Sequence, residues 1–170
     1  MAEWFDLVDE EGRRTGEKAL RSDCHGNPDL LHQAVHVFVV NNRGELFLQK
    51  RSMAKDIHPG KWDTSVGGHV DAGENAADAA VRELREELGV NAGAPVFLYH
   101  YLWRSPVESE FIRSYRLRYE GPFQLQASEL DDGKFWSLKE IENALGQELF
   151  TPNFEHEWPK IRPFLESAIS

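Results

Sequence analysis

Three glutamates in one short segment are the residues of this sequence best placed to do chemistry. Glu83 and Glu87 are four residues apart, and Glu86 lies three residues beyond Glu83. On an α-helix, side chains at these spacings lie on one side, about one turn from each other. Hard cations such as Mg²⁺ take oxygen ligands and usually bind through a few carboxylates together with the phosphates of a substrate. Because clustered carboxylates repel one another unless a cation lies among them, the spacing favours a divalent-metal site.

A helix over about residues 75 to 88 must carry these glutamates. Its apolar residues recur at steps of three and four, which predicts one buried stripe: Ala77, Ala80, Val81, Leu84 and Leu88. Gly89 then ends the helix. The acidic strip flanks the apolar stripe, so the helix can dock on a sheet and still present carboxylates at the edge of a cleft. The alternative is a solvated helical face on which Arg82 and Glu86 form an i,i+4 ion pair.

A glycine-rich loop that includes Gly67, Gly68 and Gly73 leads directly into this helix. Glycine lets the backbone approach a ligand closely. Loops that lead into helices are also natural sites for anions. The loop therefore favours the metal site over the solvated face.

The rest of the pattern predicts a sheet with helices around it. Residues 3 to 22 should form a β-hairpin, and residues 52 to 74 should be rich in loops. Strands are expected at about 34 to 40, 45 to 50, 96 to 103 and 111 to 119, and further helices at about 138 to 145 and 154 to 168. This order predicts an α/β (α+β) protein with helices covering a mixed β-sheet.

Length and composition are typical of a soluble globular domain. The 170 residues suit one domain, and no apolar run approaches the roughly 20 residues that cross a bilayer. The single cysteine, Cys24, fits a reducing compartment, and no secretory signal is visible, so we expect a cytoplasmic protein that binds no membrane. A net charge of −10 should repel a phosphate backbone, which argues against bulk nucleic-acid binding. Monomer and homodimer both stay open.

The segment over residues 68 to 90 resembles the Nudix box, G-x5-E-x7-R-E-U-x-E-E-x-G-U, where U is an aliphatic residue. Every fixed position is filled, from Gly68 and Glu74 through Arg82 to Gly89 and Val90. The resemblance implies a single Nudix domain over residues 1–170 with an α/β/α sandwich. It also implies hydrolysis of a phosphoanhydride bond in a small-molecule substrate, a nucleoside diphosphate derivative or a related diphosphate, with Mg²⁺ or Mn²⁺ as the cofactor.

The same resemblance implies a role for each matching position. The metal ligands would be a loop carbonyl and the three box glutamates: Gly67, Glu83, Glu86 and Glu87. One of these glutamates or a nearby acid would help to deprotonate water. Glu74 and Arg82 would hold the loop against the helix. No organic cofactor is expected.

Outside the box, over about residues 4 to 155, the chain is similar to isopentenyl-diphosphate isomerases and to bacterial Nudix proteins grouped with them. The matching stretches are Leu31-His32, Asn42-Arg43-Gly44, Leu48 to Ser52, Lys55, Pro59 to Trp62 and Gly68-His69. These isomerases bind a metal through three histidines and two glutamates, and the matching positions are His25, His32, His69, Glu108 and Glu110. The resemblance therefore implies a second metal site. The alternative is that these are ordinary surface or hydrogen-bonded side chains.

Two departures separate the chain from the isomerases. Their catalytic cysteine falls at Gly67 here, and a catalytic tryptophan falls at Asn153. Isomerisation places a proton on one carbon and removes one from another, each through a positioned acid or base, and the cysteine half of that chemistry is missing. We therefore expect a hydrolase. An isomerase-like enzyme is one alternative, and a non-catalytic Nudix nucleotide-binding module is another, although such modules tend to lose box glutamates.

Overall fold

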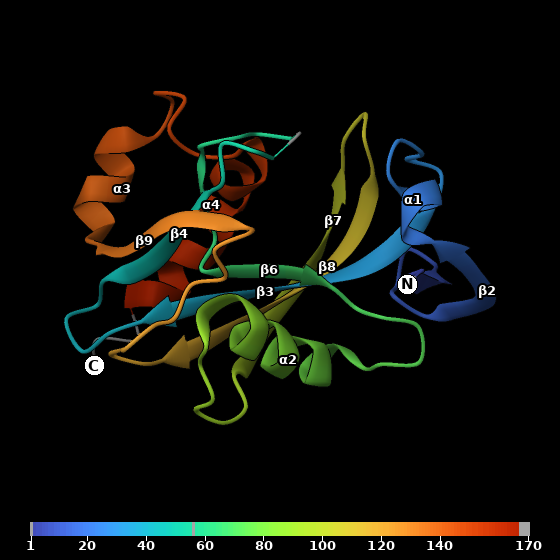
Figure 1. Cartoon of the computed structure of the whole chain (residues 1–170), viewed down its shortest axis with the longest axis horizontal. Helices are drawn as coiled ribbons and strands as arrows, with labels where there is room; N and C mark the ends of the chain where they lie inside the picture. The colour runs from blue at the N-terminus through green and yellow to red at the C-terminus, as the bar shows by residue number, and fades with distance from the viewer. Residues whose placement is uncertain (1, 56, 167–170) are drawn as a thin grey trace.

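A mixed β-sheet built around one long strand organises the molecule (Figure 1). The structure is a computed structural model that describes residues 2–55 and 57–166. Its central strand, β3 (Leu31–Val40), pairs antiparallel with β6 (Val66–His69) and parallel with β8 (Ser109–Arg118). Parallel neighbours need a long crossover connection, and α2 (Ala76–Leu88) lies within it.

The other elements extend this centre. The remaining strands are β1 (Trp4–Val8), β2 (Arg14–Leu20), β4 (Leu46–Arg51), β5 (Trp62–Asp63), β7 (Val96–Arg104) and β9 (Leu130–Trp136). The remaining helices are α1 (Arg21–Cys24), α3 (Leu138–Ala144) and α4 (Pro152–Glu166). β1 and β2 form the N-terminal hairpin, β4 pairs with β5 and β9, and β7 pairs with β8.

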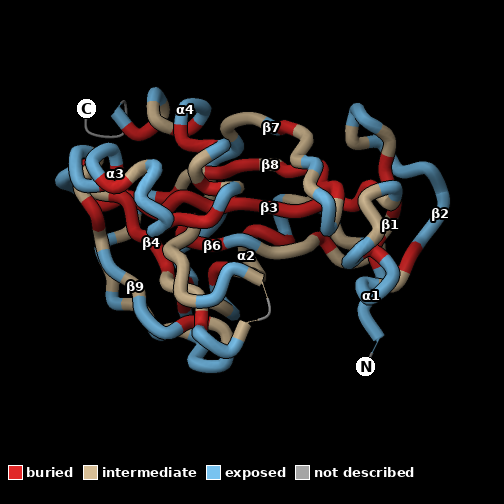
Figure 2. Tube along the Cα trace, turned by 90° about the horizontal axis from the view of Figure 1, so that it is seen from above, coloured by how far each residue is buried: buried red, intermediate tan, exposed pale blue. Residues whose placement is uncertain are grey.

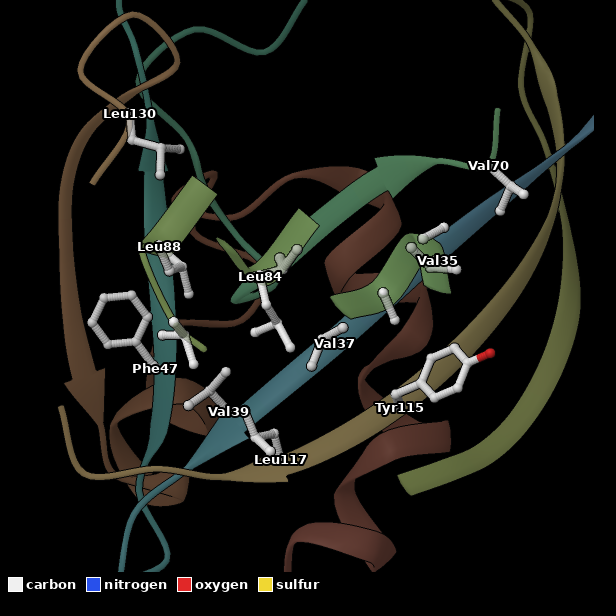
Figure 3. Close-up of a cluster of buried hydrophobic side chains, with 14 residues drawn as sticks. Val35, Val37, Val39, Phe47, Val70, Leu84, Leu88, Tyr115, Leu117 and Leu130 are labelled. Atoms are coloured by element: carbon white, nitrogen blue, oxygen red, sulfur yellow. The ribbon is translucent and has the colours of Figure 1, made fainter. Parts of the chain in front are cut away.

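β3 is buried along its whole length (Figure 2). The reason is that α2 covers one face of the sheet and α3 and α4 cover the other (Figure 1). Alternate side chains of a strand point to opposite faces. On one face a hydrophobic cluster joins β3 to α2 through Val35, Val37, Val39, Leu84 and Leu88 (Figure 3). On the other face Phe38 and Val40 belong to a second cluster that α3 and α4 complete. The predicted mixed sheet between layers of helices is confirmed.

The structure also contains elements that the sequence did not predict. The short α1 is one, and β5 and β6 lie within residues 52 to 74, which were expected to be loop-rich. β6 carries two adjacent glycines, which disfavour a strand, but its pairing with β3 outweighs that local preference. β9 was missed because its Asp-Asp-Gly centre is typical of a turn. The last helix begins at Pro152, and residues 167 and 168 of the prediction lie outside the described residues. Within the described ranges, no helix is long and apolar enough to span a membrane.

Candidate active site

α2 has a capped start and a glycine stop. The side chain of Asn75 accepts a hydrogen bond of 2.8 Å from the amide of Asp78, which satisfies a free N–H of the first turn. At the other end Gly89 takes a left-handed φ of 65°, which a residue with a side chain adopts only with strain. Both ends of the acidic helix are therefore fixed by local sequence.

The helix is rotated about its axis relative to the predicted stripe. Its buried residues are Ala79, Ala80, Leu84 and Leu88. Ala77, expected in the stripe, is exposed, and Val81 is only half-buried. The buried face lies closer to Ala79 than the spacing predicted. At about 100° per residue, this rotation turns Glu83 and Glu87 inward, toward β6.

Glu83 and Glu87 both contact β6. A Cβ atom at Gly68 would lie 2.3 Å from Cδ of Glu83, so the carboxylate occupies space that only a glycine leaves free. The amide of Gly67 donates to Oε2 of Glu87 over 3.3 Å. The side chain of Glu86 is 48% exposed, whereas Glu83 and Glu87 are half-buried. The structure thus brings Gly67, Glu83 and Glu87 together and leaves Glu86 outermost.

Arg82 connects the helix to the loop. Its Nε and Nη2 donate to the two carboxylate oxygens of Glu74, each over 2.9 Å, in a bidentate pair. Nη2 also donates to the carbonyl of His69 at 3.0 Å, and Nη1 donates to Glu83 at 2.8 Å and to Glu86 at 3.2 Å. The Arg82–Glu86 pair of a solvated face is present, but the other contacts of Arg82 are with the loop and with Glu83. The acidic strip is therefore part of a built site.

The electrostatics of the strip suit a cation. Burial raises the pKa of Glu83, and burial together with the charge of Glu83 raises the pKa of Glu87 well above its ordinary value. Burial opposes ionisation of Glu74 too, but the hydrogen bonds from Arg82 outweigh it and lower the pKa of Glu74. Both inward side chains offer carboxylate oxygens, and without a cation their ionised forms are disfavoured. A hard divalent cation fits this donor set.

A second cluster of metal-ligand residues lies at the start of β8. Ligand atoms of His32, His69, Glu108 and Glu110 all lie within 4.8 Å of one another. Strand pairing explains this, because Glu110 lies beside His32 in the β3–β8 pair and β6 brings His69 against β3 from the other side. His25 lies outside this group of four, but its Nε2 is 3.7 Å from Oε2 of Glu108. The five predicted residues thus converge.

Two atoms of this cluster are buried without a hydrogen-bond partner among the described residues, Nε2 of His32 and Oε2 of Glu108. Unsatisfied buried polar atoms are costly, and a bridging ion would satisfy both. Nδ1 of His32 lies 3.3 Å from the carbonyl of Leu30, which fixes its proton there and leaves a lone pair on Nε2. Burial lowers the pKa of His32 to about 4, while burial and the charge of Glu110 raise the pKa of Glu108 to about 7. Neutral imidazole with carboxylate suits Zn²⁺ or Mn²⁺.

Sequence analysis missed a polar network that lies beside Gly67. Glu157 of α4 is fully buried and contacts His36 of β3. Burial alone would lower the pKa of His36, but the charge and the hydrogen bond of Glu157 outweigh it and raise that pKa. A signal was available, because Glu157 interrupts the apolar stripe of the last helix: Phe154, Trp158, Ile161 and Leu165.

The chain is similar in sequence to known proteins of one family. The NUDIX domain family matches residues 30–154. An uncharacterized Nudix hydrolase of Yersinia pestis is 33% identical and covers 96% of this chain and 94% of its own length. Isopentenyl-diphosphate Delta-isomerase 1 of Photorhabdus laumondii is 30% identical, over 91% of this chain and 92% of its own.

Solved structures show the same fold. The crystal structure of DR0079 from Deinococcus radiodurans has a TM-score of 0.78 and 27% identity, and the match covers 93% of this chain and 98% of that one. The family match covers most of the chain, including the complete box, and the curated relatives include both Nudix hydrolases and isomerases. The chain therefore belongs to the Nudix family, whose hydrolases are enzymes that act on diphosphate bonds.

Proposed function

We propose that this protein hydrolyses a phosphoanhydride bond of a nucleoside diphosphate derivative or a related diphosphate, with Mg²⁺ or Mn²⁺. The observation that carries this proposal is the pair Glu83 and Glu87, turned inward against Gly67 and Gly68. These two carboxylates, the carbonyl of Gly67 and the outer Glu86 would hold the cation. When bound, the cation would neutralise charge that develops on the phosphate oxygens.

The protein's own groups divide the remaining work. One of the inward glutamates accepts a proton from the attacking water, a role that a raised carboxylate pKa supports. Arg82 fixes the position of Glu83 through their 2.8 Å hydrogen bond. Glu74 balances the charge of Arg82 and holds it against the loop. Positioning of this kind limits how far the reacting groups must move during the reaction.

A second cation at the His/Glu cluster, defined as His25, His32, His69, Glu108 and Glu110, is part of the proposal. Its support is the convergence of these side chains and the two unsatisfied buried atoms. His69 directly follows Gly68 on β6, so the cluster and the box share one strand. Both sites could then contact one diphosphate, as paired ions do in many phosphoryl-transfer enzymes.

A substrate panel tests the hydrolase. The panel should contain nucleoside di- and triphosphates, nucleotide sugars, dinucleoside polyphosphates and isopentenyl diphosphate, each with Mg²⁺ and with Mn²⁺. We expect release of phosphate or a nucleoside monophosphate from at least one compound, and EDTA should stop it. If the panel shows no turnover with either metal, a nucleotide-binding module becomes the better account.

We expect no isomerisation of isopentenyl diphosphate, because Gly67 offers no thiol where the isomerases have their catalytic cysteine. The measurement is proton exchange and product formation in D₂O followed by NMR, with an authentic isomerase as the positive control. Formation of dimethylallyl diphosphate at an ordinary enzymatic rate would contradict this expectation. The variant Gly67→Cys is a useful companion, since a Cβ there would make only ordinary contact, 3.5 Å from the ring of His36.

A further inference from the structure

Glu157 is the most completely bonded carboxylate among the described residues. Its Oε1 accepts hydrogen bonds from Nδ1 of His36 at 2.6 Å and from the hydroxyl of Tyr101 at 2.7 Å. Its Oε2 accepts from the hydroxyls of Tyr99 and Ser114, each at 2.6 Å. A carboxyl group that accepts four hydrogen bonds is in its ionised, acceptor-only form. Three hydroxyls and one imidazole therefore hold this anion in a single orientation.

A fully buried carboxylate needs a compensating cation. His36 is the basic group bonded to it, and the imidazolium form of the ring supplies that charge. Apolar residues of similar volume often stabilise a protein as well as a buried ion pair does. Stability therefore does not explain why the second helical layer carries a glutamate at a position of its apolar stripe. The position of this glutamate is explained if it orients the His36 ring, whose Nε2 edge is free to bind a ligand.

That free edge lies beside Gly67, on the face of the sheet that α4 covers. His36 is the cross-strand partner of Gly67, and a Cβ at Gly67 would lie 3.8 Å from Nε2 of His36. Gly67 is exposed, so the space beside this ring edge opens to solvent. With Nδ1 bonded to Glu157, Nε2 is the ring nitrogen left to donate, and the described part of the chain gives it no hydrogen bond. The same Gly67 touches Glu87 through its amide.

We propose that His36, oriented by Glu157, binds a phosphate oxygen of the substrate beside the box cation. The inference rests on the proposed diphosphate substrate and deepens it by naming a phosphate-binding residue outside the box. Nε2–H of His36 donates to the phosphate, and the carboxylate of Glu157 keeps the ring in place and charged. His36 is the binding residue, and Glu157 is a positioning residue that acts through it.

Binding of inorganic pyrophosphate with Mg²⁺, measured by isothermal titration calorimetry, tests this role without turnover. The substitution His36→Asn keeps an amide donor near the place of Nδ1 and removes the Nε2 edge. It should weaken binding about tenfold to a hundredfold, the range for a lost hydrogen bond to a charged group. The substitution His100→Asn is the matched control, since His100 is exposed on the face of β7 opposite to Tyr99 and Tyr101. It should leave pyrophosphate binding unchanged.

NMR separates binding from a structural role in the unaltered protein. Pyrophosphate should shift the ¹⁵N resonance of Nε2 of His36 far more than that of Nδ1, and this readout holds even if the variants fail to fold. If folded His36→Asn binds pyrophosphate as the unaltered protein does, or if the Nε2 resonance does not respond, the inference is overturned. Hydrolysis of a panel substrate together with either result would leave the proposed function standing. If binding depends on His36 but no panel compound is hydrolysed, the inference stands and the proposed hydrolase function fails.

Discussion

Replacing Glu87 by glutamine is expected to lower turnover by about two to four orders of magnitude while the protein still folds. Glutamine keeps the shape of the side chain and its contact with Gly67 but removes the charge that would bind the cation. Glu83→Gln should have an effect of the same size, because both carboxylates turn inward to β6. Glu86→Gln should lower turnover less, since the side chain of Glu86 is 48% exposed.

Steady-state kinetics on the hydrolysed panel substrate, with circular dichroism for folding, measures this effect. Glu17→Gln is the matched control, because Glu17 is exposed on β2 in the N-terminal hairpin. If Glu83→Gln and Glu87→Gln both fold and keep near-normal activity, the acidic strip is only a charged helical face.

The substitution Glu87→Gln should also stabilise the metal-free protein. The pKa of Glu87 is raised well above its ordinary value of 4.5 by burial and by Glu83, so ionising it costs folding free energy. That cost is absent below about pH 4.5 and grows as pH rises through the folded-state pKa. Glu87→Gln should therefore raise the melting temperature in EDTA at pH 8 and lose this advantage at pH 4. A lower melting temperature for the variant at pH 8 would contradict the assigned burial.

The His/Glu cluster should bind one equivalent of Zn²⁺ or Mn²⁺ that the variants Glu110→Ala and His25→Ala lose to different degrees. Glu110 approaches both His32, at 3.7 Å, and His69, at 3.4 Å, so its removal should abolish the site. His25 contacts only Glu108 within the cluster at salt-bridge distance, so its removal should weaken the site without abolishing it. Metal analysis after gel filtration measures the stoichiometry, and equal metal content in all three proteins would rule the site out.

The pH dependence of this second site follows from Glu108 and from His69. Burial alone would lower the pKa of His69, but the hydrogen bond and charge of Glu110 outweigh it and raise that pKa. His32 is already neutral at pH 7, because burial holds its pKa at about 4. Glu108 has a pKa of about 7, from burial and the charge of Glu110, so its proton must leave when a metal binds. Affinity should therefore rise as pH increases through about 7. A titration by isothermal calorimetry at pH 6 and pH 8 measures the change, and equal affinity at both would exclude Glu108 and His69 as ligands.

Local signals were sufficient to predict the acidic helix. The spacing of its apolar residues, and Gly89 at its end, lie within the segment itself, and α2 starts and stops within one residue of the prediction. The rotation that buries Ala79 and turns Glu83 inward depends on packing against β3, which no local pattern contains. The inward pair could therefore be named from the sequence, but the reason for its position could not be derived from it.

Long-range pairing explains what the sequence could not show. β6 is a strand because β3 lies beside it, and its glycines alone predict a loop. His36 and Glu157 are 121 residues apart, and only the packing of α4 on the sheet brings them together. A family resemblance predicts the residues of the His/Glu cluster, but their convergence depends on the long-range pairing of β3 with β6 and β8, which lie side by side (Figure 1).

Hydrolysis in H₂¹⁸O is the most direct test of the central claim that the box performs metal-dependent attack of water on a phosphoanhydride. The hydrolysed panel substrate is incubated with metal-stripped protein, then with the same protein after Mg²⁺ or Mn²⁺ is restored, and the products are analysed by mass spectrometry. We predict no product without metal and, with metal, one ¹⁸O atom in a single phosphate-containing product. Product formed equally well without metal, or product that carries no ¹⁸O, would contradict the account.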